Sequence, residues 1–514
     1  MEGYVYYEYV KCGNDMLFTV VMLPKSEGEY PTVVCRSPYV KKAEAQTEED
    51  IAREYLAVYA PWMRRGYAVV FQHCRGQGKS TGAFVPYVHE REDGLCLREW
   101  IRRQAFYNGE LFLMGASYTA SVHYATAPFE EDVRGAVFEV QDCERYRLWY
   151  RNGQMRKGHA NWHFGLYKSK CGLDKAFDMS SFSQLPLSGL SERVLGDRAE
   201  DFEQMLAAEG PRDGFWRTRF GGDDARDAAV NANIPILFTT GYNDFYVGGL
   251  FRMWRGLDAA TREKSALLVS PYNHGDGYNG DRGIRFENGK RTERFGGEYR
   301  IAWFDSIRLG TPLPFDKGVI TYYRAFENVW QSDFDAVPTR ELALPLGSGV
   351  RTLCYDPYDP PAFCGEGVFA DEQDRNGSVI SVYTQPLAED IFVKGRMRAR
   401  LAVACDRPDS SFYVRICRHN ADGDYVLRHD ITSLCYQLGD YTENTEVVLD
   451  FLFDEYAFLL RRGETLRIDI SATDNNTYVC HTNRRGKYYL QDGADIATST
   501  VYLDRCELVI PIEG

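Results

Sequence analysis

The sequence has no long apolar run, no closely spaced cysteine pair and no export signal. No stretch reaches the roughly 18 consecutive apolar residues that predict a membrane-spanning helix. The 13 cysteines are odd in number and lie singly, without a C-x-x-C pair, which disfavours a disulfide framework and a zinc site and predicts reduced thiols. The segment from Met1 to Tyr4 does not begin a basic and apolar signal peptide. We therefore expect a cytoplasmic protein.

Positive charge is also scarce. The chain has 60 Lys and Arg against 74 Asp and Glu, a net charge of −14, and it contains no dense basic run. Such a surface repels phosphate backbones and anionic headgroups. The composition thus predicts neither a nucleic-acid partner nor a membrane partner, and it disfavours anionic substrates.

The length of 514 residues predicts about three domains. In residues 1–143, short apolar runs such as Tyr67–Phe71 and Leu111–Met114 alternate with segments of helical length. The alternation resumes in residues 234–338, beginning with the run Ile234–Thr240. Strands that alternate with helices indicate a mainly parallel sheet covered on both faces. We expect these two segments to form one α/β core.

Two other regions have a different texture. Residues 144–233 are charged and aromatic and contain no strand-like run, which predicts a helical cap inserted into the core. Residues 339–514 contain many short runs of strand length separated by polar turns. That pattern is typical of a β-sandwich.

The strongest local signal is a serine between a strand and a helix. The run that ends at Met114 leads into Gly115, Ser117 and Ala120 in a G-x-S-x-A pattern, and a helix-compatible stretch follows. A sharp turn of this kind pushes the serine hydroxyl out over the edge of a sheet. Alanine replaces the usual last glycine, a change that adds only a methyl group. We predict that Ser117 is a nucleophile.

Nine histidines compete for the role of base, and position in the fold selects among them. In this architecture the acid and then the histidine follow the serine, each after a later strand. His274 lies in the loop after the strand-like run Ala266–Val269, and Asp244 lies in the turn after the run that ends at Thr240. The competing acids are Asp258 and Asp276, the second of which shares the loop of His274.

An oxyanion hole needs two hydrogen-bond donors. The backbone N–H of Tyr118, directly after the serine, is one of them by geometry. The second usually comes from the loop after an early strand, which here contains Tyr39. The hydroxyl of this tyrosine would replace a backbone donor.

Two further motifs suggest a bound ligand but are better explained without one. The stretch Gly76–Ser80 resembles a nucleotide-binding loop but lacks the required spacing. His73 and Cys74 suggest a metal pair but have no further ligands nearby. We therefore interpret His73 and Cys74 as structural residues.

Taken together, these segments resemble the CocE/NonD hydrolases, the group of cocaine esterase, the α-amino-acid ester hydrolases and the X-Pro dipeptidyl-peptidases. The resemblance runs nearly end to end. It rests on the R-S-P-Y segment at Arg36–Tyr39, the R-G-Y-A-V-V and R-G-Q-G-K-S-T-G blocks at 65–70 and 75–82, the G-A-S-Y elbow at 115–118, the G-Y-N-D turn at 241–244, the S-P-Y-N-H loop at 270–274 and the proline-rich segment at 355–361.

The resemblance implies an α/β-hydrolase core, a helical cap between nucleophile and acid, and a C-terminal jelly-roll β-sandwich. It also implies the roles of Ser117 as nucleophile, His274 as base, Asp244 as its orienting acid, and Tyr39 with the Tyr118 N–H as oxyanion donors. The resemblance implies no metal and no organic cofactor. Relatives often self-associate, so a homo-oligomer is an open alternative.

The sequence departs from the family pattern at several positions. His73 stands where the family usually has an aspartate, and Ala120 replaces a glycine. Phe245 and Tyr246 follow Asp244, where α-amino-acid ester hydrolases have acids that help bind a substrate ammonium. This disfavours recognition of a free amine there, although Asp142 and Glu144 near the cap would offer carboxylates.

We therefore predict a serine hydrolase that cleaves a small-molecule ester, or an amide, through an acyl-enzyme. The pocket is expected to be shaped by aromatic side chains, among them Trp149, Trp162 and Phe245. One alternative is an X-Pro dipeptidyl-peptidase-like peptidase. The other is a non-catalytic binding protein that uses the β-sandwich.

Overall fold

The structure is a computed structural model that describes residues 3–40, 46–170, 179–218, 232–274, 298–336, 339–370 and 377–514. Asp276, one of the competing acids, lies outside the described residues. Among the described residues, no helix is both long and apolar enough to cross a bilayer.

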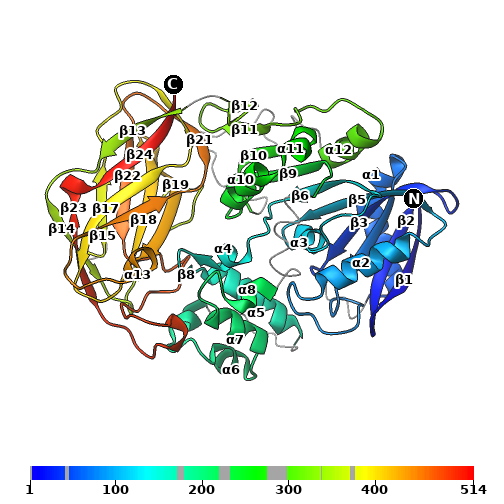
Figure 1. The fold of residues 1–514 in the computed structure, drawn as a ribbon, viewed down its shortest axis with the longest axis horizontal. Coiled ribbons are helices and arrows are strands. Elements are labelled where there is room, and N and C mark those ends of the chain that lie inside the picture. Colours follow the sequence, from blue (N-terminus) through cyan, green and yellow to red (C-terminus); the bar gives the residue numbers. More distant parts are fainter. Residues whose placement is uncertain are drawn as a thin grey trace.

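The first part of the chain is built on a sheet that contains ten strands in the described residues, in the order β1-β2-β4-β3-β5-β6-β9-β10-β11-β12 (Figure 1). Strands β4 to β11 of this order run parallel, whereas β1, β2 and β12 pair antiparallel at the two edges. The strands are β1 (Tyr4–Cys12), β2 (Asp15–Leu23), β3 (Tyr30–Ser37), β4 (Ala68–His73), β5 (Tyr107–Ala116), β6 (Val133–Glu139), β9 (Ile236–Asn243), β10 (Ala266–Asn273), β11 (Ile320–Arg324) and β12 (Val329–Gln331).

Helices cover both faces of this sheet because its central strands are apolar on both sides. In β5, Leu111 and Leu113 pack with residues of α2, α3 and α10, whereas Phe112 packs on the other face with residues of α1 and α12. The expected mainly parallel sheet with two covered faces is thus observed. The helices are α1 (Glu48–Arg64), α2 (Glu90–Ile101), α3 (Tyr118–Tyr124), α10 (Val247–Gly256), α11 (Ala259–Lys264) and α12 (Tyr299–Arg308).

The segment between β6 and β9 forms a helical cap, seen below the sheet in Figure 1. It differs from the sequence expectation in one respect, because it also contains a small antiparallel ribbon of β7 and β8. The two strands are only two residues long, too short for any periodic pattern in the sequence. The cap consists of α4 (Arg145–Trp149), β7 (Tyr150–Arg151), β8 (Gln154–Met155), α5 (Lys157–Lys170), η1 (Met179–Ser183), α6 (Leu190–Leu195), α7 (Glu200–Ala207) and α8 (Gly214–Thr218).

The C-terminal part is mostly sheet. In the described residues it has a sheet of eight strands with the path β14-β23-β17-β24-β16-β21, in which β13 pairs with β24 and β20 with β17, and a sheet of four with the order β15-β22-β18-β19. The jelly-roll description stays a prediction. The elements are β13 (Thr339–Pro345), β14 (Val350–Tyr355), β15 (Val379–Tyr383), β16 (Ile391–Gly395), β17 (Arg398–Cys405), β18 (Ser411–Asn420), β19 (Gly423–Ser433), α13 (Leu434–Leu438), β20 (Val447–Leu452), β21 (Tyr456–Leu460), β22 (Thr465–Ser471), η4 (Tyr488–Leu490), β23 (Ala497–Tyr502), η5 (Leu503–Arg505) and β24 (Glu507–Glu513).

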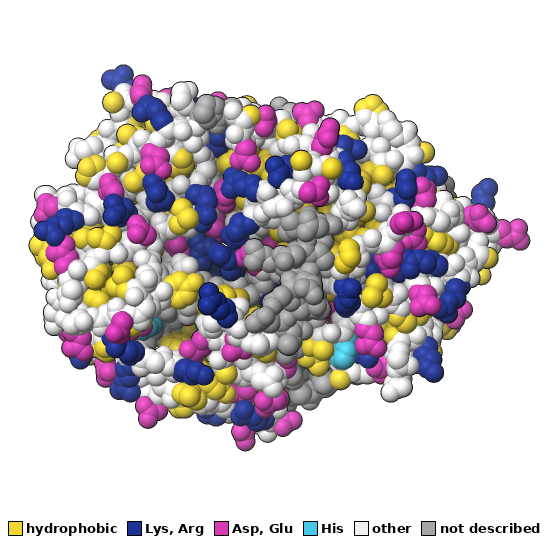
Figure 2. All heavy atoms as spheres, in the orientation of Figure 1, with side chains coloured by type: hydrophobic (Ala, Val, Ile, Leu, Met, Phe, Trp, Pro, Cys, Tyr) yellow, Lys and Arg dark blue, Asp and Glu magenta, His cyan; other side chains and the backbone are white. Residues whose placement is uncertain are grey.

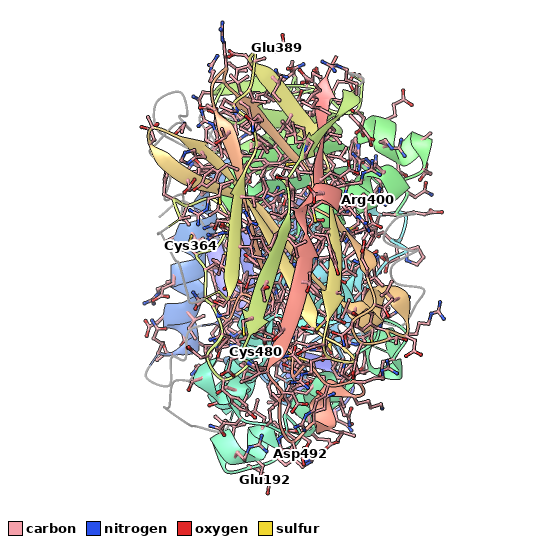
Figure 3. All side chains as sticks on the ribbon, turned by 90° about the vertical axis from the view of Figure 1, so that its left-hand side faces the viewer. Glu192, Cys364, Glu389, Arg400, Cys480 and Asp492 are labelled. Atoms are coloured by element: carbon pink, nitrogen blue, oxygen red, sulfur yellow. A yellow bond between two sulfur atoms is a disulfide. The ribbon has the colours of Figure 1, made fainter. Side chains whose placement is uncertain are left out.

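The C-terminal part packs directly on the cap. The backbone N–H of Tyr489 donates to the Glu209 carboxylate at 2.6 Å, and the Tyr489 hydroxyl donates to Glu203 at 2.8 Å. Figure 3 shows Glu192 of the cap and Asp492 of the C-terminal part at the same end of the molecule. The cap and the C-terminal part are therefore in direct contact through Tyr489.

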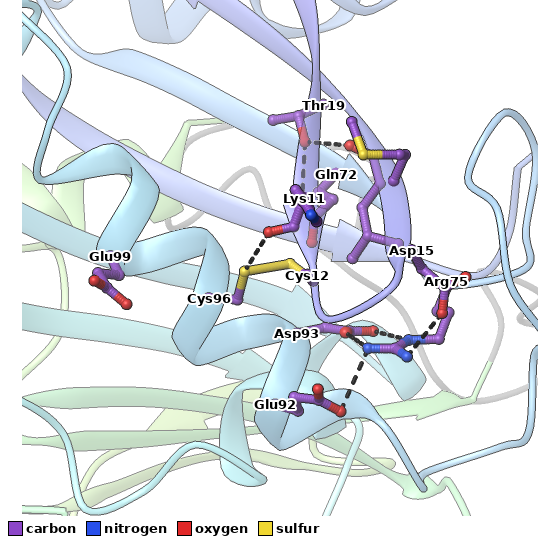
Figure 4. The surroundings of a disulfide bond; sticks show 12 residues. Lys11, Cys12, Asp15, Thr19, Gln72, Arg75, Glu92, Asp93, Cys96 and Glu99 are labelled. Atoms are coloured by element: carbon purple, nitrogen blue, oxygen red, sulfur yellow. Dashed lines mark hydrogen bonds and ion pairs between the residues drawn. A yellow bond between two sulfur atoms is a disulfide. The ribbon is translucent and has the colours of Figure 1, made fainter.

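One cysteine pair contradicts the expectation of reduced thiols. Cys12 at the end of β1 and Cys96 on α2 form a disulfide, with their Cα atoms 6.0 Å apart across a sequence separation of 84 (Figure 4). Beside it, Arg75 contacts the carboxylates of Asp15 and Asp93. The disulfide joins the edge strand of the sheet to a helix. The spacing of the cysteines in the sequence does not predict this contact between distant segments.

Candidate active site

Ser117 occupies the tight turn between β5 and α3. Its φ of 54° lies in the left-handed region, which a side chain rarely adopts. A Cβ at Gly115 would lie 2.0 Å from the Thr119 carbonyl oxygen, so only glycine permits this approach of strand and helix. Ala120 is fully buried in α3, and its methyl group is accommodated in the core. The turn thus presents the Ser117 hydroxyl at the carboxyl end of the sheet.

His274 joins Ser117 to Asp244. Its Nε2 lies 3.0 Å from the Ser117 Oγ, and its Nδ1 lies 3.2 Å from Asp244 Oδ1. The three side chains come from the ends of β5, β9 and β10, and His274 follows Ser117 by 157 residues and Asp244 by 30. The sheet brings them together because the carboxyl ends of neighbouring parallel strands meet at one edge.

Asp244 is held rigidly below the imidazole. It is 1% exposed and accepts hydrogen bonds from the Tyr246 N–H at 3.1 Å and from the Thr240 hydroxyl at 3.3 Å. At Gly241, in the same turn, a Cβ would lie 2.1 Å from the Tyr272 carbonyl oxygen. This close packing fixes the loops that carry the acid and the histidine. The competing Asp258 instead caps α11 by accepting from the Thr261 N–H.

Tyr39 follows β3 and reaches the same site. Its hydroxyl accepts a hydrogen bond from the Trp162 indole N–H at 3.2 Å, and its ring packs edge-on against Tyr118. The side chain is 49% exposed, yet it lies in the wall of the cavity, and desolvation there raises its pKa to about 12. The nearby Trp162 and Ser117 act on this pKa in the opposite direction. The phenol is therefore protonated at neutral pH.

Tyr118 contributes differently. Its side chain is buried, with the hydroxyl donating to the Glu90 carboxylate at 2.8 Å and accepting from the Tyr87 N–H at 2.8 Å. These contacts hold the first turn of α3 and direct the phenol away from the serine. Only the backbone of Tyr118 is placed to act beside Ser117.

A cavity of about 650 Å³ opens onto these residues. Of the three aromatic residues expected to shape the pocket, Trp162 and Phe245 line it. Trp149 does not line this cavity, because it is buried behind Trp162 and Tyr87. Phe245 packs on the His274 imidazole with a ring-centre distance of 4.5 Å.

The chain is similar to known proteins over most of its length. Residues 13–276 match the X-Pro dipeptidyl-peptidase (S15) family, and residues 331–505 match the C-terminal non-catalytic domain of X-Pro dipeptidyl-peptidase. The chain belongs to the S15 family. It is a hydrolase of the CocE/NonD type, from a family of serine hydrolases that cleave ester or peptide bonds.

Individual relatives of this S15 chain cover nearly its whole length. Cocaine esterase of Rhodococcus sp. (strain MB1 Bresler) is 24% identical over 95% of each chain. The structure of an α-amino acid ester hydrolase covers 100% of this chain and 97% of its own, with a TM-score of 0.79 and 16% identity. A CocE/NonD family hydrolase from Staphylococcus aureus covers 100% and 94%, with a TM-score of 0.65 and 15% identity.

The acids that the sequence offered for amine recognition do not line the cavity of this S15 hydrolase. Asp142 is buried, which raises its pKa to about 6, and the Arg252 guanidinium is the opposing influence. Arg252 also lies 3.3 Å from Glu144. Both carboxylates are thus engaged beneath the cap.

The C-terminal sheets supply charged groups that sequence reasoning missed. Glu366, His429 and Asp454 line the cavity, together with Arg151 and Arg156 of the cap. None of them lies near the serine, acid or histidine in sequence, so no local pattern marks them. A signal would have come only from knowing which loops of the C-terminal part meet the cap.

His73, which replaces the usual family aspartate, is a buried neutral imidazole. It is 2% exposed, its Nδ1 accepts from the Lys79 N–H at 3.3 Å, and its Nε2 lies 3.1 Å from the Tyr55 hydroxyl. Burial, reinforced by the Lys79 charge, lowers its pKa to about 4. Both ring nitrogens are therefore used within the core.

This burial predicts a pH dependence of stability. Because the pKa of His73 is lower in the folded chain than in the unfolded one, the unfolded chain binds the proton first as pH falls from about 6.5 to 4. We expect this residue to contribute a loss of about 2 kcal/mol in unfolding free energy over that window. Urea unfolding at pH 7 and pH 4.5 measures it.

The control is His73→Gln, which removes the titrating group, with His89→Gln as a matched change at a partly exposed histidine. The His73 variant should be less sensitive to acid than the wild type, and the His89 variant should not differ from it. Equal acid sensitivity in all three proteins would contradict the assignment.

Proposed function

We propose that the protein is a serine esterase that works through an acyl-enzyme, with Ser117 as nucleophile, His274 as general base and Asp244 as the residue that orients the imidazole. The observation that carries this proposal is the continuous contact of Ser117 Oγ, His274 and Asp244 at 3.0 and 3.2 Å. The cap is proposed to span residues 144–233 between core segments 1–143 and 234–338, with a jelly-roll over 339–514.

The reaction follows from this geometry. The Ser117 oxygen attacks the ester carbonyl while its proton passes to His274 Nε2, and Asp244 stabilises the imidazolium that forms. The imidazolium then protonates the departing alkoxide as the C–O bond breaks, which leaves the acyl group on Ser117. Water, deprotonated by His274, attacks the acyl-enzyme and releases the acid.

The tetrahedral oxyanion would be held by the Tyr39 hydroxyl and the Tyr118 backbone N–H. The raised pKa of Tyr39, about 12, supports this role because a donor must stay protonated at working pH. The neighbouring Trp162 N–H donates to the same oxygen and fixes the phenol in place.

Replacing Tyr39 by phenylalanine removes this donor while keeping the ring. We expect Tyr39→Phe to lower kcat by about 100- to 1000-fold, the usual loss for one oxyanion donor. Because Tyr39 does not titrate below its pKa of about 12, the loss should be constant from pH 6 to 9. Steady-state hydrolysis of an aryl acetate measures both.

Tyr383→Phe, at a 48% exposed tyrosine of β15, is the matched control and should retain wild-type kcat. A Tyr39 variant with unchanged kcat would remove this residue from the oxyanion hole without affecting the assignment of the nucleophile.

An ester is favoured over an X-Pro peptide because each carboxylate that the C-terminal part contributes to the described cavity wall lies in an ion pair with an arginine. Glu366 lies 2.9 Å from Arg428, and Asp454 lies 3.0 Å from Arg151. An ammonium group would have to displace one of these arginines.

Covalent labelling tests the proposal. A fluorophosphonate probe should label the wild-type enzyme once, and peptide mass spectrometry should locate the adduct on Ser117. Comparing the hydrolysis of aryl esters with that of an X-Pro anilide separates the two activities. A label on another residue, or none, would refute the proposal, and faster hydrolysis of the anilide would favour the peptidase.

A further inference from the structure

Arg156 is a cation in the wall of the cavity that has no anionic partner among the described residues. It is partly exposed, and no carboxylate of the described chain lies within the 4.0 Å of an ion pair. Its Nη1 is buried without a hydrogen-bond acceptor. Buried guanidinium groups are normally paired or hydrogen-bonded, so such an atom calls for an explanation.

The other charges of the cavity are matched within the protein. Arg151 lies 2.7 Å from Asp430 and 3.0 Å from Asp454. Glu366 accepts from Arg428 at 2.9 Å and from the His429 backbone N–H at 3.0 Å. Glu366, Asp430 and Asp454 thus each have an ion-pair partner in Arg151 or Arg428, although Asp454 Oδ1 has no hydrogen bond. Arg156 is the arginine of this group that has no ion-pair partner among the described residues.

Two histidines that feel the charge of Arg156 do not neutralise it. Burial lowers the pKa of His429 to about 4 and the pKa of His159 well below its ordinary value, and the charge of Arg156 contributes to both shifts. Both imidazoles are therefore neutral at physiological pH. Figure 2 shows Lys and Arg side chains near the middle of the face that it draws.

The backbone of Arg156 is held on both sides by hydrogen bonds to the cap and to the C-terminal part. Its N–H donates to the Trp149 carbonyl at 2.7 Å, and the residue forms a β-bridge with Tyr478 of the C-terminal part. The next residue, Lys157, donates its N–H to the Thr477 carbonyl at 2.9 Å. Arg156 is therefore fixed at the seam between cap and C-terminal sheets.

The same helix connects Arg156 to the reacting groups. Arg156 directly precedes α5, whose His159 and Trp162 also line the cavity, and Trp162 donates to Tyr39. Arg156 and Trp162 are six positions apart, which corresponds to a rise of about 9 Å along the helix axis. A substrate that reaches from Ser117 to Arg156 must therefore extend past the aromatic part of the cavity.

We propose that the substrate carries a carboxylate at the end remote from its scissile ester, and that Arg156 binds this carboxylate. The inference rests on the proposed esterase function and names its substrate class. A single guanidinium without an ion-pair partner among the described residues matches a monoanion better than a doubly charged phosphate. The negative net charge of the chain disfavours anionic substrates only on average, whereas Arg156 offers a local cation in the cavity wall.

The test uses 4-nitrophenyl half-esters of dicarboxylic acids from glutarate to suberate, each paired with the neutral ester in which the free carboxylate is methylated. The wild-type enzyme should prefer the anionic member of at least one pair by 10-fold or more in kcat/KM. Arg156→Gln should lower that preference by about 10- to 100-fold, the range for losing a charged hydrogen bond. Arg156→Lys should retain part of it.

Arg212→Gln, at an exposed arginine of the cap, is the matched control and should keep the wild-type preference. A second measurement needs no turnover of the anionic ester: the free dicarboxylate should inhibit hydrolysis of a neutral ester competitively, and more weakly in Arg156→Gln. Melting temperatures confirm that the variants are folded.

The outcomes separate the two proposals. Hydrolysis of neutral esters without preference for any half-ester, or a preference that survives in Arg156→Gln, overturns the role of Arg156 and leaves the esterase standing. A preference for aminoacyl esters also overturns it, because Glu366 or Asp454 would then bind a cation. No hydrolysis of any ester and no labelling of Ser117 overturns the proposed function itself.

Discussion

Ser117→Ala is expected to lower kcat for an aryl ester by about a million-fold. The variant loses the oxygen that lies 3.0 Å from His274 Nε2, so the attack cannot take place and no acyl-enzyme forms. A residual rate above the uncatalysed reaction should remain, because the oxyanion donors are untouched. Steady-state kinetics, with active-site titration of the wild type, measures the loss.

The change should leave the fold intact, since Ser117 lies in a turn whose shape depends on Gly115 and on the packing of α3. Ser183→Ala, at an exposed serine of the cap, is the matched control and should keep full activity. An active Ser117 variant would show that another group performs the attack.

Asp244→Asn should lower kcat by about ten-thousand-fold with little effect on folding. The amide nitrogen can donate to His274 Nδ1, which favours the imidazole tautomer that carries its proton on Nε2 and is then unable to accept the serine proton. Oδ1 of Asp244 is also the acceptor of the Tyr246 N–H, so this hydrogen bond is lost when the amide nitrogen faces His274, whereas the Thr240 hydroxyl still donates to the amide oxygen and the loop should keep its shape. Kinetics and thermal unfolding separate the two effects.

Asp258→Asn provides the comparison. Asp258 was the competing acid in the sequence, and here it caps α11, a role that asparagine fills equally well. This variant should behave as the wild type in kcat and in melting temperature. A loss of activity in Asp258→Asn that matched the loss in Asp244→Asn would overturn the choice between the two acids.

The sequence predicts the α/β core because that part of the fold is governed by local rules. A run such as Leu111–Met114 is apolar on both faces and is followed by Gly115 and Ser117, so strand, turn and helix are all marked within a few residues. His274 and Asp244 are recoverable for the same reason: each directly follows a strand. Parallel strands then force their carboxyl ends together.

The residues that the C-terminal part contributes to the cavity cannot be predicted by such local rules. Glu366 lies in a loop and Asp454 in a connection between strands, and nothing in their neighbourhoods indicates that they face the cap. The Cys12–Cys96 disulfide could not be predicted either, because a separation of 84 residues indicates a pairing only once the fold is known. Arg156 becomes distinctive only when the partners of every neighbouring charge are known.

The contact between the cap and the C-terminal sheets, where Arg156 pairs with Tyr478, lies in a part of the enzyme distinct from the α/β core. In the proposed mechanism, side chains of the core make and break the bonds, whereas the cap and the C-terminal part supply much of the cavity wall and no reacting atom. Mutations on that surface can accumulate without endangering turnover. Grafting the C-terminal half of one relative onto another should therefore exchange substrate preference while leaving the catalytic step in place.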